Sequence, residues 1–208
     1  MGLLSGRSTT QAFYVLGEVP NNFHETYFTN IQNNRFLEID AYADRDESIG
    51  WTMIDDILET NLRWDKILVS DYLTLTMRID TLKIPGPILK ATLKKAFREY
   101  REEHNKEHLS KMVKLEIQDR IMKEFRKKVL PTIRTYEVIW NMPEGKVYFS
   151  GTSTKVIDQF GELFERTFDL RLAAHSCYTA LLYGGFAQDI PEKVLQLEPM
   201  DFLQGIRM

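Results

Sequence analysis

The strongest constraint on the fold is a strict alternation of apolar and polar residues between positions 73 and 80. The odd positions hold leucine, methionine and isoleucine, whereas the even positions hold threonine, arginine and aspartate. Because successive side chains of a strand point to opposite faces of a sheet, this pattern predicts a strand with one buried face. The sequence Ile-Pro-Gly-Pro at residues 84–87 ends the strand, and Pro87 suits the first position of a helix.

Two long helices are predicted to follow this strand. Apolar residues recur at helical spacing from Leu89 to Tyr100 and predict a helix over residues 87–104. A second helix is predicted over residues 111–129, with Ser110 as its N-cap and Pro131 just after its end. Together they predict a long charged helical hairpin over residues 87–129.

Shorter periodic runs predict the remaining elements. Strands are expected over residues 10–19, 48–53, 134–140, 146–150 and 170–174, and further helices over residues 23–34 and 153–168. The sequence Asn-Met-Pro-Glu-Gly at 141–145 predicts a hairpin turn. Strands and helices follow one another without regular βαβ alternation, which favours an α+β fold with mainly antiparallel sheets.

The length of 208 residues suits one large domain or two small ones. We expect an N-terminal αβ unit at residues 1–70, a central α+β domain at 71–176 and a C-terminal extension at 177–208. The sequence has neither a long apolar run nor a signal-peptide pattern, so a cytoplasmic location is expected.

Charge is segregated along the chain. Residues 83–134 contain 15 Lys or Arg against 7 Asp or Glu, whereas residues 1–82 contain 6 against 13 and residues 135–208 contain 6 against 10. The formal net charge of −3 therefore conceals a local basic excess. A polyanion that binds clustered Lys and Arg gains affinity mainly through counterion release, so this segment is a candidate site for nucleic acid.

The first predicted helix carries the clearest basic pattern. Lys90, Lys94, Arg98 and Arg101 recur at spacings of four, four and three residues and would form one stripe on its surface. We predict that DNA contacts come from this stripe and from neighbouring cations of both helices: Lys90, Lys94, Lys95, Arg98, Arg101, Lys111, Lys114, Lys123, Arg126, Lys127 and Lys128. No base-reading motif is apparent, so backbone contacts with weak sequence preference are expected.

Charge alone leaves a second interpretation open. Cations near the end of a helix also stabilise its dipole, and glutamates at helical spacing pair with lysines on an ordinary solvated surface. The basic excess over residues 83–134 can therefore arise without any ligand.

From Gly50 onward, the order of these features resembles the RdgC family of recombination-associated bacterial DNA-binding proteins. The shared landmarks are the Gly50-Trp51 pair, a strand that leads into a proline-initiated charged helical hairpin, and the Leu130-Pro131 pair. The stretch VLPTIRTYEVIWNMPEGKVYFSGTSTKV carries most of the resemblance, which covers residues 10–176.

The resemblance implies a non-enzymatic protein that binds double- and single-stranded DNA with little sequence preference. It also implies a nucleoid-associated homodimer that encircles the duplex and limits access of the RecA recombinase. Members of the family are longer and complete the ring with a C-terminal region. For this chain an open dimer is therefore expected as an alternative, as is a replacement contact from residues 186–208.

Two other functions remain as alternatives. The family has also been labelled an exonuclease, and a metal-dependent nuclease needs clustered carboxylates. The candidate carboxylates have local explanations: Glu144-Gly145-Lys146 in a hairpin turn, Asp55 and Asp56 at the start of a short helix, Asp80 at the end of its strand, and Asp71 nearby. The third function is a protein-interaction module that uses the charged hairpin.

No catalytic residue, metal or cofactor is predicted. His104 and His108 are spaced for one helix face, but a third metal ligand is missing. Cys177 is the single cysteine, so an internal disulfide is impossible, and we expect it to be a small buried side chain.

Overall fold

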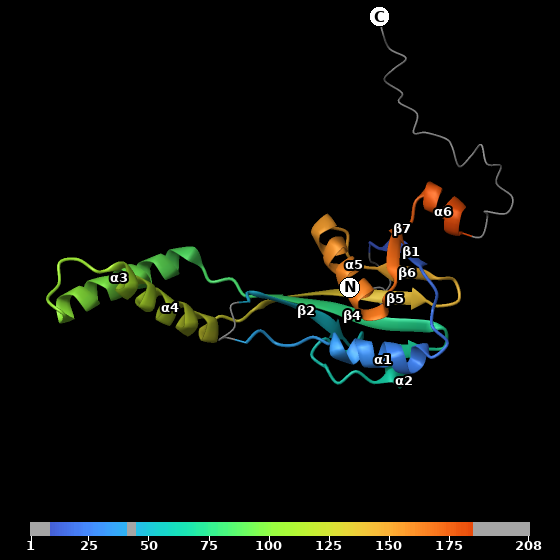
Figure 1. Cartoon of the computed structure of the whole chain (residues 1–208), viewed down its shortest axis with the longest axis horizontal. Helices are drawn as coiled ribbons and strands as arrows, with labels where there is room; N and C mark the ends of the chain where they lie inside the picture. Colours follow the sequence, from blue (N-terminus) through green and yellow to red (C-terminus); the bar gives the residue numbers. More distant parts are fainter. Residues whose placement is uncertain (1–8, 41–44, 185–208) are drawn as a thin grey trace, which may run out of the picture.

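The alternating segment forms β4 (Tyr72–Thr81), a central strand of one antiparallel sheet (Figure 1). The computed structural model describes residues 9–40 and 45–184. The seven-stranded sheet has the order β2-β4-β5-β6-β1-β7, and β3 also pairs with β4. The predicted α+β class with antiparallel sheet is therefore confirmed. The other strands are β1 (Gln11–Leu16), β2 (Glu47–Thr52), β3 (Leu68–Val69), β5 (Thr132–Asn141), β6 (Lys146–Phe149) and β7 (Arg171–Ala174).

Six helices accompany the sheet in the described residues: α1 (Phe23–Asn33), α2 (Trp64–Ile67), α3 (Gly86–Glu103), α4 (Lys111–Lys128), α5 (Thr154–Phe168) and α6 (Cys177–Tyr183). The ends of the longer elements follow signals that the sequence already contains. Ser153 caps α5 by accepting a hydrogen bond from the Val156 amide, and Gly145 takes a positive φ of 60° in the turn between β5 and β6. The short elements α2 and β3 are too brief to show a periodicity in the sequence.

Helices α1 and α5 cover the same face of the sheet. Tyr27 of α1 and Phe168 of α5 meet edge to face, with ring centroids 5.1 Å apart, and both also contact the ring of Trp140 in β5. Deeper in this core, the rings of Phe149 and Phe160 stack with centroids 4.0 Å apart. These buried aromatic rings join both helices to the sheet.

The second face of β4 is also buried, although it carries polar side chains. Arg78 and Asp80 form an ion pair with side chains only 7% and 2% exposed, and Arg78 also donates to the Ile57 carbonyl oxygen at 3.1 Å. The Arg78 guanidinium lies 4.2 Å from the ring centroid of Phe36. A side chain at Gly50 would come within 2.5 Å of the Phe36 backbone, so glycine allows this close approach.

Two local predictions about acidic residues have different outcomes. Asp80 is the last residue but one of β4, close to the predicted end of the strand, and it forms a buried ion pair with Arg78. Asp55 and Asp56 do not begin a helix, because Asp56 Oδ1 accepts a hydrogen bond from the Leu58 amide at 2.9 Å and closes a turn.

Strands from both sides of residue 70 belong to the same sheet. β2 pairs with β4, while β1 lies between β6 and β7. The ranges 1–70 and 71–176 thus share one core.

The C-terminal range 177–208 begins with α6, but the contact expected from residues 186–208 lies outside the described residues. In the ranges 9–40 and 45–184, no helix is long and apolar enough to cross a membrane.

Candidate nucleic-acid interface

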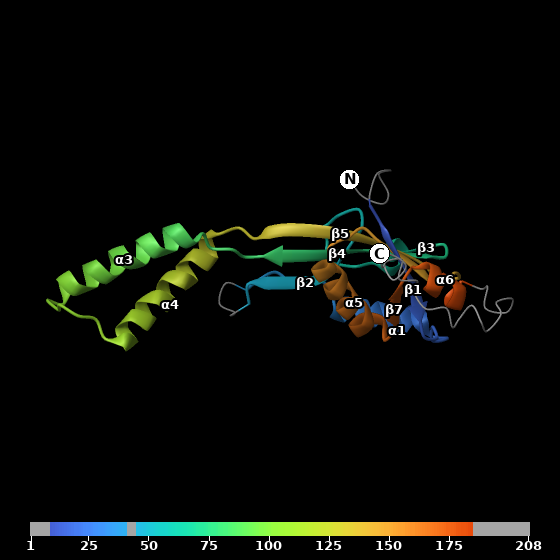
Figure 2. The ribbon, with the colours of Figure 1, turned by 90° about the horizontal axis from the view of Figure 1, so that it is seen from above.

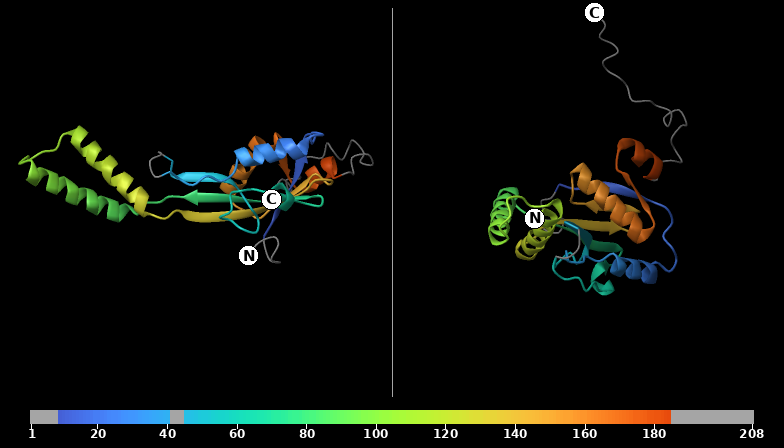
Figure 3. Two further views of the ribbon diagram at one scale, coloured as in Figure 1. Left: turned by 90° about the horizontal axis from the view of Figure 1, so that it is seen from below. Right: turned by 60° about the vertical axis from the view of Figure 1, so that its left-hand side comes forward.

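Helices α3 and α4 project beyond one end of the sheet (Figure 2). β4 leads into α3 and α4 leads back into β5, and these two strands pair without interruption from Tyr72↔Asn141 to Thr81↔Thr132. Both connections therefore leave the sheet side by side. In both views of Figure 3, α3 and α4 lie apart from the other helices. We refer to residues 86–128 as the arm.

The arm has little buried surface. Ser110 caps α4 by accepting a hydrogen bond from the Val113 amide, as predicted. Within α4 the buried residues are Ile117 and Ile121, whereas none of the described residues of α3 is buried. The apolar side of α3 is only half-buried against α4. The arm therefore contributes far less to the hydrophobic core than α5 does.

The predicted basic stripe on α3 is exposed along its whole length. Lys90, Lys94, Arg98 and Arg101 are all exposed. Arg98 Nε lies 3.9 Å from Glu102 Oε1, and Arg101 Nε donates to the Phe97 carbonyl oxygen at 3.2 Å. Each guanidinium keeps further donors that these contacts do not use.

The candidate cations of α4 divide into two groups. Lys111, Lys114, Lys123, Lys127 and Lys128 are exposed, as is Lys95 on α3. Arg126 differs, because its side chain is only 10% exposed and its Nη2 lies 2.8 Å from Asp46 Oδ1. Arg126 is therefore largely shielded from solvent at the base of the arm, whereas the side chains of the other ten candidates are exposed.

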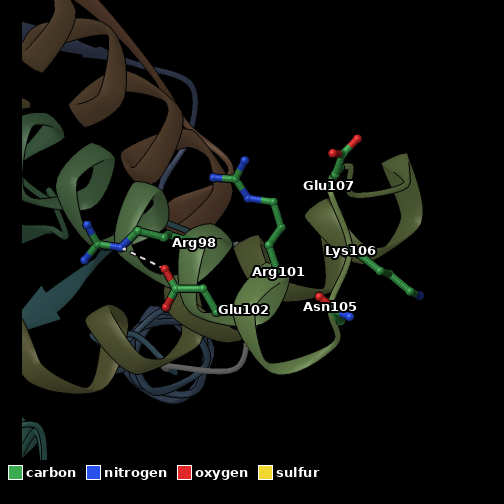
Figure 4. Close-up of a pocket in the computed structure, with 6 residues that line it drawn as sticks. All are labelled: Arg98, Arg101, Glu102, Asn105, Lys106 and Glu107. Atoms are coloured by element: carbon green, nitrogen blue, oxygen red, sulfur yellow. Dashed lines mark ion pairs between the residues drawn. The ribbon is translucent and has the colours of Figure 1, made fainter.

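A shallow hollow of about 370 Å³ lies at the far end of α3 (Figure 4). It is lined by Arg98, Arg101, Glu102, Asn105, Lys106 and Glu107. These side chains diverge instead of pointing at one position, and two glutamates lie among the three cations. This arrangement suits separate contacts with an extended polyanion better than the enclosure of a small ligand.

The structure offers no support for the nuclease carboxylates within its described residues. Glu144 Oε2 binds Lys146 Nζ at 2.9 Å, and this hydrogen bond raises the pKa of Lys146. Asp80 is neutralised by Arg78. No group of three or more His, Cys, Asp or Glu side chains in ranges 9–40 and 45–184 could hold a metal ion.

The other side chains considered in the sequence, His104, His108 and Cys177, form no common site in the described residues. The helical pairing of His104 with His108 does not form, because α3 ends at Glu103. His104 instead stacks on Tyr100, with ring centroids 4.0 Å apart. The expectation for Cys177 is wrong, because its side chain is exposed at the start of α6.

Two polar contacts of the folded chain have no clear signal in the sequence. The first is the buried pair Arg78–Asp80, whose only signal is an arginine and an aspartate two residues apart within a strand. The second is the contact between Asp46 and Arg126, which are 80 residues apart and share no sequence pattern.

Comparison with known proteins leaves the family open. No protein-family model matches the sequence, and no curated protein matches it. The resemblance to RdgC thus rests on the sequence landmarks described above.

Proposed function

We propose that this protein is a non-enzymatic, sequence-nonspecific DNA-binding protein of the RdgC type. The single observation that carries the proposal is the stripe of Lys90, Lys94, Arg98 and Arg101 on a projecting helix. In this proposal the arm acts as a long charged helical hairpin, and its cations contact the phosphate backbone.

The dimensions of the stripe fit backbone contact. Its first and last residues, Lys90 and Arg101, are eleven positions apart, which corresponds to about 16 Å along a helix axis. If all four cations neutralise phosphates, they contribute about −3.6 to the slope of log K against log salt for duplex DNA. For a single strand the corresponding contribution is about −2.8. The four cations are thus sufficient to produce a measurable salt dependence.

We extend the proposal to the biological role that the resemblance implies. The protein would act as a nucleoid-associated homodimer in recombination or replication. By coating or encircling DNA it would limit access of the RecA recombinase. The slender arm and the absence of a base-reading motif in the sequence support a coating role over recognition of a specific site.

A gel-shift titration over a salt series tests the proposal. We expect the fourfold variant Lys90→Glu, Lys94→Glu, Arg98→Glu and Arg101→Glu to weaken duplex binding by about 100-fold or more at low salt and to flatten the salt slope. A matched control reverses four exposed cations of the sheet body: Arg35, Arg63, Lys66 and Arg171. Equal losses in the two variants, or no binding by the parent protein, would refute the proposal.

A second candidate function is a protein-interaction arm. Its supporting observation is the exposure of apolar residues on the same helices, namely Ile88 (52%), Met112 (72%) and Leu115 (50%). Exposed apolar side chains of this kind often mark contacts with another protein. This candidate predicts that Met112→Ser with Leu115→Ser reduces self-association in analytical ultracentrifugation and leaves duplex binding unchanged.

A further inference from the structure

A cluster of polar side chains joins the base of the arm to the sheet body. It is centred on Asp46 and Glu47, where β2 begins, and its other members come from four different elements or connections. We call it the base cluster; it comprises the side chains of Asp46, Glu47, Arg126, Arg134, Lys155 and Gln159, together with the backbone amide of Leu82.

Asp46 contacts the last turn of α4 and the connection that leads from β4 into α3. Its Oδ1 lies 2.8 Å from Arg126 Nη2, near the end of α4. Its backbone oxygen accepts a hydrogen bond from the Leu82 amide at 2.8 Å, in the connection between β4 and α3. One residue of the body thus holds the chain where it enters the arm and where it leaves it.

Glu47 connects the same place to β5 and α5. Its Oε1 lies 4.0 Å from Arg134 Nη2 and 3.8 Å from Lys155 Nζ. Its Oε2 accepts a hydrogen bond from Gln159 Nε2 at 3.2 Å. The body side of the cluster is therefore linked to a helix that is firmly packed on the sheet.

The Asp46–Arg126 pair should be stronger than the ion pairs along the arm. Its N···O distance is 2.8 Å, and the Arg126 side chain is only 10% exposed, although the Asp46 side chain is 61% exposed and water still reaches the carboxylate. By contrast, the pairs Lys95–Glu99 and Arg98–Glu102 are longer, at 3.7 and 3.9 Å, and more than half exposed. Exposed pairs of that kind contribute little to structure.

We propose that Asp46 is a positioning residue that sets the angle between the arm and the sheet. Strand pairing between β4 and β5 ends at Thr81↔Thr132, so the arm beyond it depends on contacts at its base. With Asp46 in place, the basic stripe is presented to a ligand in one orientation. The consequence for DNA rests on the proposed function, whereas the orientation itself is independent of any ligand.

Spin-label distances test the orientation without DNA. Labels at Glu103→Cys in the arm and Asp158→Cys in α5, both exposed, are introduced in a Cys177→Ser background. We expect one narrow distance distribution for this parent, a clearly broadened one after Asp46→Ala, and recovery with Asp46→Glu. Asp119→Asn is the control, because it removes an equal charge from an exposed position on α4. An Asp46→Ala distribution as narrow as that of the parent would overturn the proposal.

Duplex binding by Asp46→Ala provides a second readout, because the loss of a negative charge and the loss of the arm orientation should change the affinity in opposite directions. If charge alone mattered, removing a carboxylate beside the basic arm would tighten DNA binding. If position matters, Asp46→Ala weakens binding by about fivefold, the loss expected from one partly buried ion pair, while Asp119→Asn does not weaken it. Tighter binding by Asp46→Ala would overturn the role in DNA presentation. Failure of the parent protein to bind DNA would refute only the proposed function, since the label distances still decide the positioning role.

Discussion

At the scale of single residues, two arginine–aspartate pairs show how burial changes the contribution of an ion pair to stability. Arg63–Asp65 and Arg78–Asp80 have the same spacing, and in both the guanidinium donates through Nε and Nη2 to the two carboxylate oxygens. The first pair is more than 60% exposed, whereas the second is almost completely buried. Their sequences are therefore alike, but their contributions to stability should differ.

Neutralising the acid in each pair measures this difference. We expect Asp80→Asn to lower the free energy of unfolding by about 3 kcal/mol, because it leaves a buried guanidinium without a counterion. Asp65→Asn should lower it by less than about 1 kcal/mol, since water replaces the lost partner. Urea denaturation of both variants provides the measurement, and similar losses would contradict this interpretation of the buried pair.

Tyr27 is the second residue for which burial has a measurable consequence. Its hydroxyl group is buried without a hydrogen-bond partner among the described residues. Burial, with a smaller effect of the charge on Asp169, raises the pKa of Tyr27 to about 12. The unfolded chain would release this proton at a pH of about 10, so the folded state loses stability as the pH rises from 10 towards 12.

Tyr27→Phe should therefore stabilise the protein in two ways. At neutral pH we expect a gain of about 1 kcal/mol, because an unpaired buried hydroxyl is removed. The advantage over the parent should then grow between pH 10 and pH 12, since phenylalanine does not ionise. Denaturation at pH 7 and pH 11 checks both points, and an advantage that does not change with pH would contradict the assignment of the raised pKa.

At the scale of elements, α3 and α5 represent opposite ways of stabilising a helix. α5 buries six residues, including Phe160 and Phe164, whereas none of the described residues of α3 is buried. Helical stability in proteins comes mainly from packing of an apolar face, and α4 is the main element that α3 packs against in the described part of the chain. A weakly packed helix can adapt to the path of a DNA backbone, but it also opens easily.

Hydrogen exchange should reveal this difference directly. We expect the backbone amides in the middle of α3 to exchange at least about tenfold faster than those in the middle of α5, because local opening of α3 exposes little apolar surface. Mass spectrometry of peptides from the two helices supplies the measurement, with β4 as a slowly exchanging reference. Equal protection of α3 and α5 would show that the arm is held by contacts other than those described.

The same comparison explains which elements are predictable. The N-caps Ser110 and Ser153 and the apolar periodicity of α5 act over a few neighbouring residues, so they can be identified in the sequence. Burial of α3 cannot be identified in this way. Its apolar positions repeat at the same spacing as those of α5, but within the described residues they are covered mainly by α4 and remain partly exposed.

At the scale of the whole molecule, one sheet unites both ends of the described chain. β1 pairs with β6 from Gln11↔Phe149 to Tyr14↔Lys146, and it also pairs with β7. β2 covers the opposite end of the sheet through six pairs with β4. Removal of residues 9–70 would therefore take away the three strands β1, β2 and β3 together with α1 and α2, and would expose the aromatic core.

A fragment of residues 71–176 tests whether this range is an independent domain. We expect it to show no cooperative unfolding transition, because the rings of Trp140 and Phe168 lose their contact with Tyr27 of α1. The fragment 9–184 should unfold in a single transition followed by circular dichroism. Cooperative unfolding of the fragment 71–176 would show instead that the range folds without the N-terminal strands.

The sequence by itself determined the nature of most elements, because periodicity, caps and turn residues act within one element. It likewise determined the basic excess of residues 83–134 and the stripe on α3. Only the tertiary structure decided that β1 lies between β6 and β7, that Arg78 and Asp80 are buried, and that Asp46 meets Arg126. These features depend on contacts between residues far apart in the chain, and such contacts arise from the packing of the complete sheet and not from any short window of sequence.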